Sequence, residues 1–331
     1  MPLLSSDFRP PIPFRNGHAS TLYSALLRKP KGTDQQRERI YLEDGDFLDL
    51  DWTRQPQGTN RVIVLLHGLE GNAQRPYILG SARLFFENGY DICAVNFRGC
   101  SGEPNLTFRS YHSGATEDLS AVLRHILKTA SYQQIYLKGF SLGGNLILKF
   151  LGEQSALTRH IQGAAVISVP CDLHDSLVQL NRPGNWIYAQ RFLKSLREKV
   201  AEKQRRFPSA FPDGGVEKIH SLKDFDDFYT SRAHGFKDAL DYYKQCSSLR
   251  FLSSINTPTL LLNAQNDSFL GEKCYPFDHC RKHSHVHFES PRFGGHVGFV
   301  DKGTYYYSEK RCLEFLNALN LGAIYYLRGC I

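Results

Sequence analysis

A serine flanked by glycines is the feature of this sequence that most directly suggests chemistry. Ser141 is the centre of residues 139–143, Gly-Phe-Ser-Leu-Gly, which follow the apolar run 135–137 and precede the helix-like stretch 145–151. At a sharp turn between a strand and a helix, glycines remove side chains that would collide, and the serine hydroxyl is pushed clear of the sheet edge. We therefore predict that Ser141 is a nucleophile.

An activated serine needs a base that takes its proton and an acid that orients the base. Asp267 follows the apolar run 259–262, and His296 lies in the glycine-rich segment 293–299. The chain order of serine, acid and histidine is the one found when such a serine follows a parallel strand. Ser141, Asp267 and His296 are therefore the predicted triad. Asp172 and Asp301 remain alternative acids.

The reaction also needs hydrogen-bond donors for the oxyanion that forms on the substrate carbonyl. Such donors are backbone N–H groups, one after the nucleophile and one in the loop after an earlier strand. Leu142 and Leu69 occupy these two places, Leu69 within the segment 67–71, His-Gly-Leu-Glu-Gly. Two preset donors stabilise the intermediate by about 3 kcal/mol each. The chemistry therefore requires neither a cofactor nor a metal.

Alternating apolar strands and helical stretches surround these residues. Short apolar runs are typical of parallel strands that are covered on both faces, and the helices between them provide crossover connections. The pattern predicts an α/β fold with a doubly wound, mostly parallel sheet. The segment 39–52 alternates around Asp44-Gly45 and predicts a hairpin. The predicted strands include 61–68, 90–97, 135–137 and 163–169, and the predicted helices are 77–88, 117–129 and 144–154.

The alternation stops between about 172 and 254, where charged helical segments follow one another, and it resumes at 257–263. We interpret this interruption as a helical cap over the carboxyl ends of the strands, where open α/β folds bind ligands. The predicted domains are therefore the first part of the core (1–171), the cap (172–254) and the second part of the core (255–331). Asp226 and Asp227 in the cap could orient it, pair with arginines over the site, or begin a helix.

Composition restricts the compartment and the partners. The 331 residues are 41% hydrophobic and 22% charged, which is typical of a soluble globular protein. The formal charge of +7 is spread along the chain and gives no argument for nucleic acid. The eight cysteines form no C-x-x-C pair, the start of the chain shows no apolar signal-peptide core, and no apolar run is long enough to span a membrane. We therefore expect a reducing cytoplasm.

One segment of the predicted cap is locally basic. Residues 188–206 place an apolar helical stripe among seven lysines and arginines. Such a helix is either a solvated face whose stripe packs on the domain below or a surface that docks on anionic lipid. The stripe is Phe192, Leu193, Leu196 and Val200, and the cations are Arg191, Lys194, Arg197, Lys199, Lys203, Arg205 and Arg206.

Several motifs together resemble the α/β-hydrolase superfamily, and specifically its YheT-like branch. The resemblance covers nearly the whole chain and implies an α/β-hydrolase fold that hydrolyses carboxylic esters. Eukaryotic relatives act on acylglycerols or phospholipids, so a lipid-like ester is the implied substrate. Ser268 departs from the relatives, which often have proline after the aspartate. The motifs are 14–18 (FRNGH), 67–71 (HGLEG), 96–99 (NFRG), 139–145 (GFSLGGN), 225–230 (FDDFYT), 234–236 (HGF), Tyr242-Tyr243, Asn266-Asp267 and 294–296 (GGH).

Other functions remain open at this point. The same scaffold could bind a small apolar ligand without turnover, since a fold alone does not establish activity. A peroxidase or a dehalogenase variant of the fold is a third option, although a dehalogenase that forms an alkyl-enzyme would use aspartate where this chain has Ser141. His283, His285 and His287 would share one face of a strand and could then hold zinc, although an α/β-hydrolase site does not use a metal.

Overall fold

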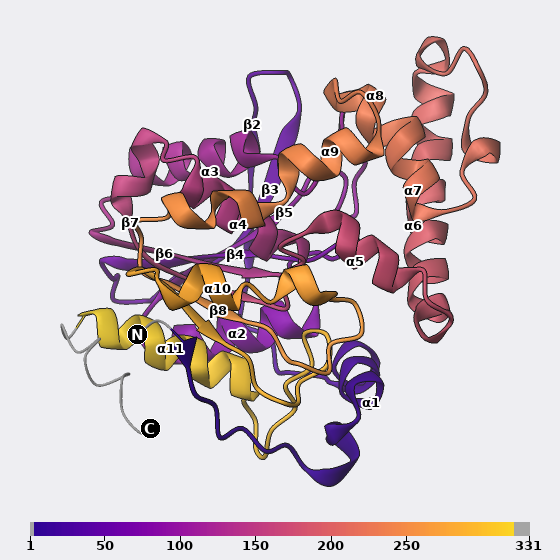
Figure 1. Cartoon of the computed structure of the whole chain (residues 1–331). Coiled ribbons are helices and arrows are strands. Elements are labelled where there is room, and N and C mark those ends of the chain that lie inside the picture. Colours follow the sequence, from indigo (N-terminus) through magenta and orange to yellow (C-terminus); the bar gives the residue numbers. More distant parts are fainter. Residues whose placement is uncertain (1–2, 321–331) are drawn as a thin grey trace.

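A nine-stranded sheet is the centre of the computed structural model, which describes residues 3–320 (Figure 1). The strand order is β1-β9-β8-β7-β6-β4-β5-β3-β2. Strand β3 is antiparallel to both of its neighbours, and the other pairs are parallel. The strands are β1 (Leu3–Leu4), β2 (Gln36–Tyr41), β3 (Phe47–Thr53), β4 (Arg61–Leu66), β5 (Asp91–Asn96), β6 (Gln134–Phe140), β7 (Ile161–Ile167), β8 (Thr259–Leu262) and β9 (Val286–Glu289).

Helices cover both faces of this sheet. Val64 and Leu137 belong to the apolar cluster on the face of α3 and α4, whereas Ile63 and Tyr136 belong to the cluster on the face of α2 and α11. This alternation follows from the two-residue period of a strand. The doubly wound, mostly parallel α/β fold is therefore confirmed. The helices of the core are α1 (Gly17–Leu22), α2 (Pro76–Glu87), α3 (Thr116–Thr129), α4 (Leu142–Gly152), α10 (Phe277–Arg281) and α11 (Tyr307–Asn320).

The predicted hairpin is present, with a longer loop than a tight two-residue turn. Tyr41 of β2 pairs with Phe47 of β3, and the N–H of Leu42 donates to the carbonyl of Asp46 (2.8 Å). Gly45 takes the left-handed conformation in this loop, with φ of 79°. Glycine adopts that conformation without the steric cost of a side chain.

Among the described residues, helices joined by loops, and no strand, lie between β7 and β8. They pack around an apolar cluster of their own, to which α6 contributes Leu193, Leu196 and Val200. Figure 1 shows α6, α7 and α8 gathered at one side of the sheet. The division of the chain at 171/172 and 254/255 stays a prediction. The helices are α5 (Leu173–Leu180), α6 (Trp186–Arg206), α7 (Leu222–Phe225), α8 (Ser231–His234) and α9 (Ala239–Cys246).

Helix α6 lies over the carboxyl ends of β4 and β5. The ammonium of Lys199 donates to a carboxylate oxygen of Glu70 (2.8 Å), four residues beyond β4. The ammonium of Lys203 donates to Oδ1 of Asn105 (2.7 Å), in the loop after β5, and its burial lowers the pKa of Lys203 to about 8. Of the seven cations in 188–206, four form intramolecular contacts: Arg197, Lys199, Lys203 and Arg206.

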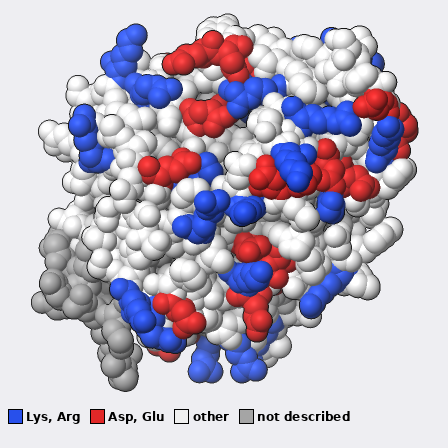
Figure 2. Space-filling view, turned by 45° about the horizontal axis from the view of Figure 1, so that its top comes forward, with Lys and Arg blue, Asp and Glu red and all other residues white. Residues whose placement is uncertain are grey.

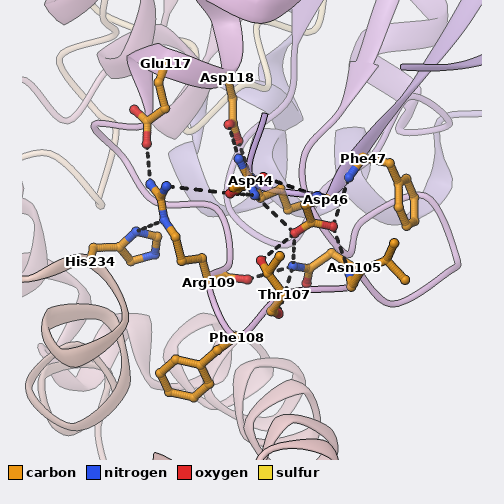
Figure 3. Close-up of polar contacts among 12 residues, drawn as sticks. Asp44, Asp46, Phe47, Asn105, Thr107, Phe108, Arg109, Glu117, Asp118 and His234 are labelled. Atoms are coloured by element: carbon orange, nitrogen blue, oxygen red, sulfur yellow. Dashed lines mark hydrogen bonds and ion pairs between the residues drawn. The ribbon is translucent and has the colours of Figure 1, made fainter. Parts of the chain in front are cut away.

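A polar network fixes the loop that follows β5 (Figure 3). Asp46 of the hairpin accepts hydrogen bonds from Asn105 (2.6 Å) and Thr107 (2.8 Å). Burial acts to raise the pKa of Asp46, but the hydrogen bonds from Asn105, the N–H of Leu106 and Thr107 outweigh it and lower the pKa. Arg109 pairs with Glu117 of α3 and donates to His234 of α8. This loop therefore joins the hairpin, the core and the cap.

The two aspartates of the cap stabilise its interior. Asp226 accepts hydrogen bonds from the hydroxyls of Tyr243 (2.6 Å) and Thr230 (2.7 Å), and its burial raises the pKa of that carboxyl to about 6. Asp227 accepts from the N–H of Ala239 (2.7 Å), the first residue of α9, and pairs with Lys223. Both carboxylates thus bind groups of the cap itself. Asp227 supports the start of α9 from a distant segment, since the residue that caps this helix is Asp238.

Charges of both signs alternate over the face that Figure 2 presents, where lysine and arginine lie among aspartate and glutamate. Among residues 3–320, no helix is long and apolar enough to cross a bilayer.

Candidate active site

Ser141 sits at a strained turn between β6 and α4. Its φ of 51° and ψ of −117° are unusual for a residue with a side chain, and its N–H donates to the carbonyl of Ile167 (2.8 Å). A Cβ on Gly139 would lie 2.6 Å from the carbonyl oxygen of Gly143, and a Cβ on Gly143 would lie 2.6 Å from that of Leu66. Backbone cannot yield at such distances, so both glycines are required. Strain of this kind is typical of functional sites.

The structure brings Ser141, His296 and Asp267 together. Nε2 of His296 lies 3.0 Å from Oγ of Ser141, and Nδ1 lies 2.8 Å from Oδ2 of Asp267. The Asp267 side chain is fully buried, whereas 11% of the His296 side chain is exposed. The imidazole is therefore oriented by a buried carboxylate and faces the serine hydroxyl, which is the geometry of a charge-stabilised general base. The catalytic roles of the three groups remain a prediction.

Contacts from distant segments hold the acid and the histidine in place. Oδ1 of Asp267 accepts from the N–H of Phe269 (2.9 Å), whose ring stacks on the imidazole of His296 with 4.2 Å between centroids. The N–H of His296 donates to Oγ1 of Thr21 in α1 (2.8 Å). Sequence reasoning missed Thr21 and Phe269. The one sequence signal for Thr21 was weak: it lies three residues after the FRNGH motif. That motif does not predict a contact with residue 296.

The alternative acids lie elsewhere. Asp172 accepts from the N–H of Asp175 (2.9 Å) and so caps the first turn of α5. Asp301 pairs with Lys310 of α11 (2.5 Å). Neither carboxylate is hydrogen-bonded to His296 in the described part of the chain. Asp267 is thus the acid that this geometry selects.

The two N–H groups proposed to bind the oxyanion come from the loop after β4 and from the start of α4. Leu142 is the first residue of α4, so its N–H has no acceptor within the helix. The N–H groups of Gly68 and Glu70 donate to the hydroxyls of Tyr77 (3.1 Å) and Tyr111 (2.9 Å). These bonds fix the loop without engaging the N–H of Leu69. The role of both leucines as donors remains a prediction.

His67 supports this loop and is not placed as a base. Its Nε2 accepts from the N–H of Phe97 (3.2 Å), so the proton is on Nδ1, which donates to the carbonyl of Gly68 (2.7 Å). Burial lowers the pKa of His67 to about 3. The ring therefore stays neutral and connects the loops that follow β4 and β5.

Glu70 connects the oxyanion loop with the cap, which sequence reasoning did not anticipate. Its carboxylate accepts from Tyr111 (2.6 Å), from Lys199 (2.8 Å) and from the hydroxyl of Ser195. Burial acts to raise the pKa of Glu70, but the charge of Lys199 and these hydrogen bonds outweigh it and lower the pKa. Its backbone has φ of 53°, next to Leu69. One buried carboxylate therefore binds α6 and borders a proposed oxyanion donor.

Replacing Glu70 by glutamine is expected to lower the free energy of unfolding at neutral pH by about 2 kcal/mol, because Lys199 loses its buried charged partner. The pKa of Glu70 is lower in the folded protein than in the unfolded chain. Its stabilisation is thus complete above the unfolded pKa and is lost as the pH falls through the folded pKa. The difference between wild type and Glu70→Gln should therefore shrink in acid, as urea unfolding at several pH values would measure.

The matched control is Glu202→Gln, on the same helix. Glu202 forms a surface ion pair with Arg206 one turn away (3.2 Å), which is worth about 0.5 kcal/mol or less. Equal losses of stability in the two variants, or a Glu70→Gln effect that is independent of pH, would contradict the assigned role of Glu70.

The zinc geometry considered for the three histidines is wrong. Only His287 lies in β9, and its ring packs on Phe315 (5.4 Å between centroids). His283 lies before the strand, where its Nδ1 accepts from the N–H groups of His285 and Val286 (both 3.0 Å). The chain turns here, so the three rings do not share a strand face. No cluster of metal-ligating side chains is found within the described residues.

Comparison with known proteins agrees with this arrangement. A family model described as "alpha/beta hydrolase fold" matches residues 61–302. The chain is 33% identical to "Putative esterase YheT" of Escherichia coli (strain K12), over 89% of this chain and 88% of that protein. It is 30% identical to "Phospholipase ABHD3" of Mus musculus, over 91% of this chain and 75% of that protein.

A solved structure supports the fold at lower sequence similarity. The Pyrococcus furiosus esterase Pf2001 superposes with a TM-score of 0.56 at 15% identity, covering 87% of this chain and 98% of that one. The family model alone spans well over half of the chain. The chain therefore belongs to the α/β-hydrolase superfamily, in the YheT-like branch.

Proposed function

We propose that this protein is a serine hydrolase that cleaves carboxylic esters through an acyl-enzyme. Oγ of Ser141 attacks the ester carbonyl while Nε2 of His296 takes its proton, and Asp267 stabilises the resulting imidazolium. The N–H groups of Leu69 and Leu142 bind the oxyanion. His296 then protonates the leaving alcohol as the C–O bond breaks. Water, activated by the same imidazole, finally releases the acid and restores Ser141.

The observation that carries this proposal is the hydrogen-bonded series Ser141, His296 and Asp267, with distances of 3.0 and 2.8 Å. A protein that only binds an apolar ligand has no need of a hydroxyl aligned with a carboxylate-oriented imidazole at a strained turn. Serine at position 141 also argues against an alkyl-enzyme dehalogenase, which needs a carboxylate there.

We propose a lipid-like ester, such as an acylglycerol, as the substrate. The names of relatives support this class, since one is a phospholipase. Another, from Saccharomyces cerevisiae, is named "Monoacylglycerol lipase" and is 29% identical over 85% of this chain and 63% of that protein. The ring of Phe269 stacks on His296 and that of Tyr188 packs against Phe269, so aromatic side chains border the triad, as a lipid-like substrate would require. The cytoplasm is the proposed compartment, because the seven cysteines of the described residues are free and buried, which suits a reducing environment.

A chain-length series of p-nitrophenyl esters tests the substrate class. We expect kcat/KM to rise about tenfold or more from the acetate to a medium-chain ester, because each additional buried methylene contributes about 0.8 kcal/mol. Monoacylglycerols should be hydrolysed as well. A flat or falling profile would contradict an acyl-binding site, and the absence of turnover with every ester would favour the ligand-binding alternative.

Contact with a membrane is part of the proposal. The sequence suggested the basic face of residues 188–206, but four of its cations form intramolecular contacts. Arg191 and Lys194, near the start of α6, are exposed. Any lipid contact of this helix is therefore proposed to involve its first turns.

A further inference from the structure

Large apolar side chains are exposed in two segments that lie far apart in the sequence. Ile12, Leu22, Leu26 and Leu27 are 76%, 38%, 56% and 66% exposed. Trp186 and Ile187, at the start of α6, are 63% and 67% exposed. Scattered exposed apolar residues are ordinary, but these six are more than half of the eleven in the described residues. We call them the apolar rim.

A direct contact joins the two segments. Nδ1 of His18 in α1 lies 3.2 Å from the hydroxyl of Tyr188 in α6, and the two rings stack with 5.8 Å between centroids. Leu22 is one helical turn after His18, and Trp186 and Ile187 immediately precede Tyr188. Figure 1 shows α1 close to the lower end of α6. The contact of His18 with Tyr188 therefore holds α1 beside the first turn of α6.

Both segments are rich in basic residues. Residues 8–33 contain five lysines or arginines and no acidic residue, and residues 176–197 contain four and no acidic residue. Two of these nine, Arg28 and Arg197, are engaged by Glu309 and by the carbonyl of Ile219. Exposed apolar side chains among cations are the combination that enters an anionic lipid surface, since apolar groups reach the acyl boundary and cations meet the headgroups.

Two ring contacts connect the first turn of α6 with the triad. Tyr188 packs edge-on against Phe269 with 4.8 Å between centroids, and Phe269 stacks on His296 at 4.2 Å. Two aromatic side chains in direct contact therefore join the first turn of α6 to His296.

We infer that the apolar rim docks the protein on an anionic lipid surface and presents the triad to esters held there. This inference rests on the proposed esterase function. It places the contact at α1 and the first turn of α6, not along the basic face further down that helix. Trp186 is the main anchor, because an indole is large, rigid and suited to the boundary between acyl chains and headgroups.

Vesicle flotation with the full chain tests the inference. Wild type should float with vesicles of phosphatidylglycerol and phosphatidylcholine and much less with phosphatidylcholine alone. Trp186→Ser combined with Ile187→Ser should weaken this binding about tenfold or more. The matched control combines Leu240→Ser with Phe277→Ser, which are 49% and 41% exposed and lie outside the rim. The control should bind like wild type.

Two activity measurements separate docking from catalysis. All variants should hydrolyse a water-soluble short ester like wild type, whereas the rim variant should lose activity on a lipid ester in anionic vesicles. Wild type that floats but hydrolyses neither ester would end the proposed function and leave docking intact. Wild type that hydrolyses the soluble ester but does not float would overturn docking. Light scattering adds a further check. Wild-type dimers that the rim substitutions dissociate would also overturn docking, because a second copy of the chain would then cover the rim.

Discussion

Replacing Ser141 by alanine is expected to remove ester turnover almost completely, by a factor on the order of 10⁵ to 10⁶, because no other group can form the acyl-enzyme. The same variant should lose covalent labelling by a fluorophosphonate, which reacts only with an activated serine. Mass spectrometry of labelled wild type should find one modified peptide, with the label on Ser141. Labelling and activity are two independent measurements of the same hydroxyl.

The matched control is Ser209→Ala, which removes an exposed hydroxyl of the cap. It should be labelled and active like wild type. Labelling that persists in Ser141→Ala would place the nucleophile elsewhere. Full labelling of Ser141 without turnover of any ester would point instead to a site whose acyl-enzyme is not hydrolysed, or to a substrate outside the ester class.

Local patterns were sufficient to predict the core of this fold. Apolar runs such as 61–68 and 90–97 became β4 and β5, because strands buried on both faces have few alternatives. The turn at Ser141 was also predictable, since Gly139 and Gly143 are positions where a Cβ would collide with backbone. These predictions depend on residues close together in the chain, whose hydrophobic pattern and steric size can be read from the sequence alone.

Contacts across long distances in the chain were not predictable. The bond from His296 to Thr21 joins residues 275 positions apart, and no periodicity specifies such a pairing. The ion pair between Glu70 and Lys199 could not be predicted for the same reason, because Lys199 is one of several cations on a helix that the sequence alone indicates to be solvated. The three-histidine hypothesis failed because β9 begins at Val286, three residues after His283, so the assumed strand period did not apply.

Sequence order also left the acid of the triad open among Asp172, Asp267 and Asp301. Chain order restricts where an acid can occur, but it does not say which way a side chain points. The structure resolves the geometry by placing only the Asp267 carboxylate against Nδ1 of His296 among the described residues. A mutational comparison of the three aspartates therefore tests the assignment directly.

Asp267→Asn is expected to lower kcat by about 10⁴-fold, because the amide can donate to Nδ1 and so stabilise the tautomer that carries its proton on Nε2. Because Nε2 then already carries a proton, the imidazole cannot accept the proton of Ser141. Asp301→Asn and Asp172→Asn lack contact with His296 and should retain kcat within a few-fold. Steady-state kinetics on a soluble ester, with circular dichroism to confirm folding, measure the comparison. A large loss of kcat in either of these two variants, with Asp267→Asn still active, would show that Asp267 is not the acid of the triad. His296 would then have to be oriented by a carboxylate that it does not contact in this conformation.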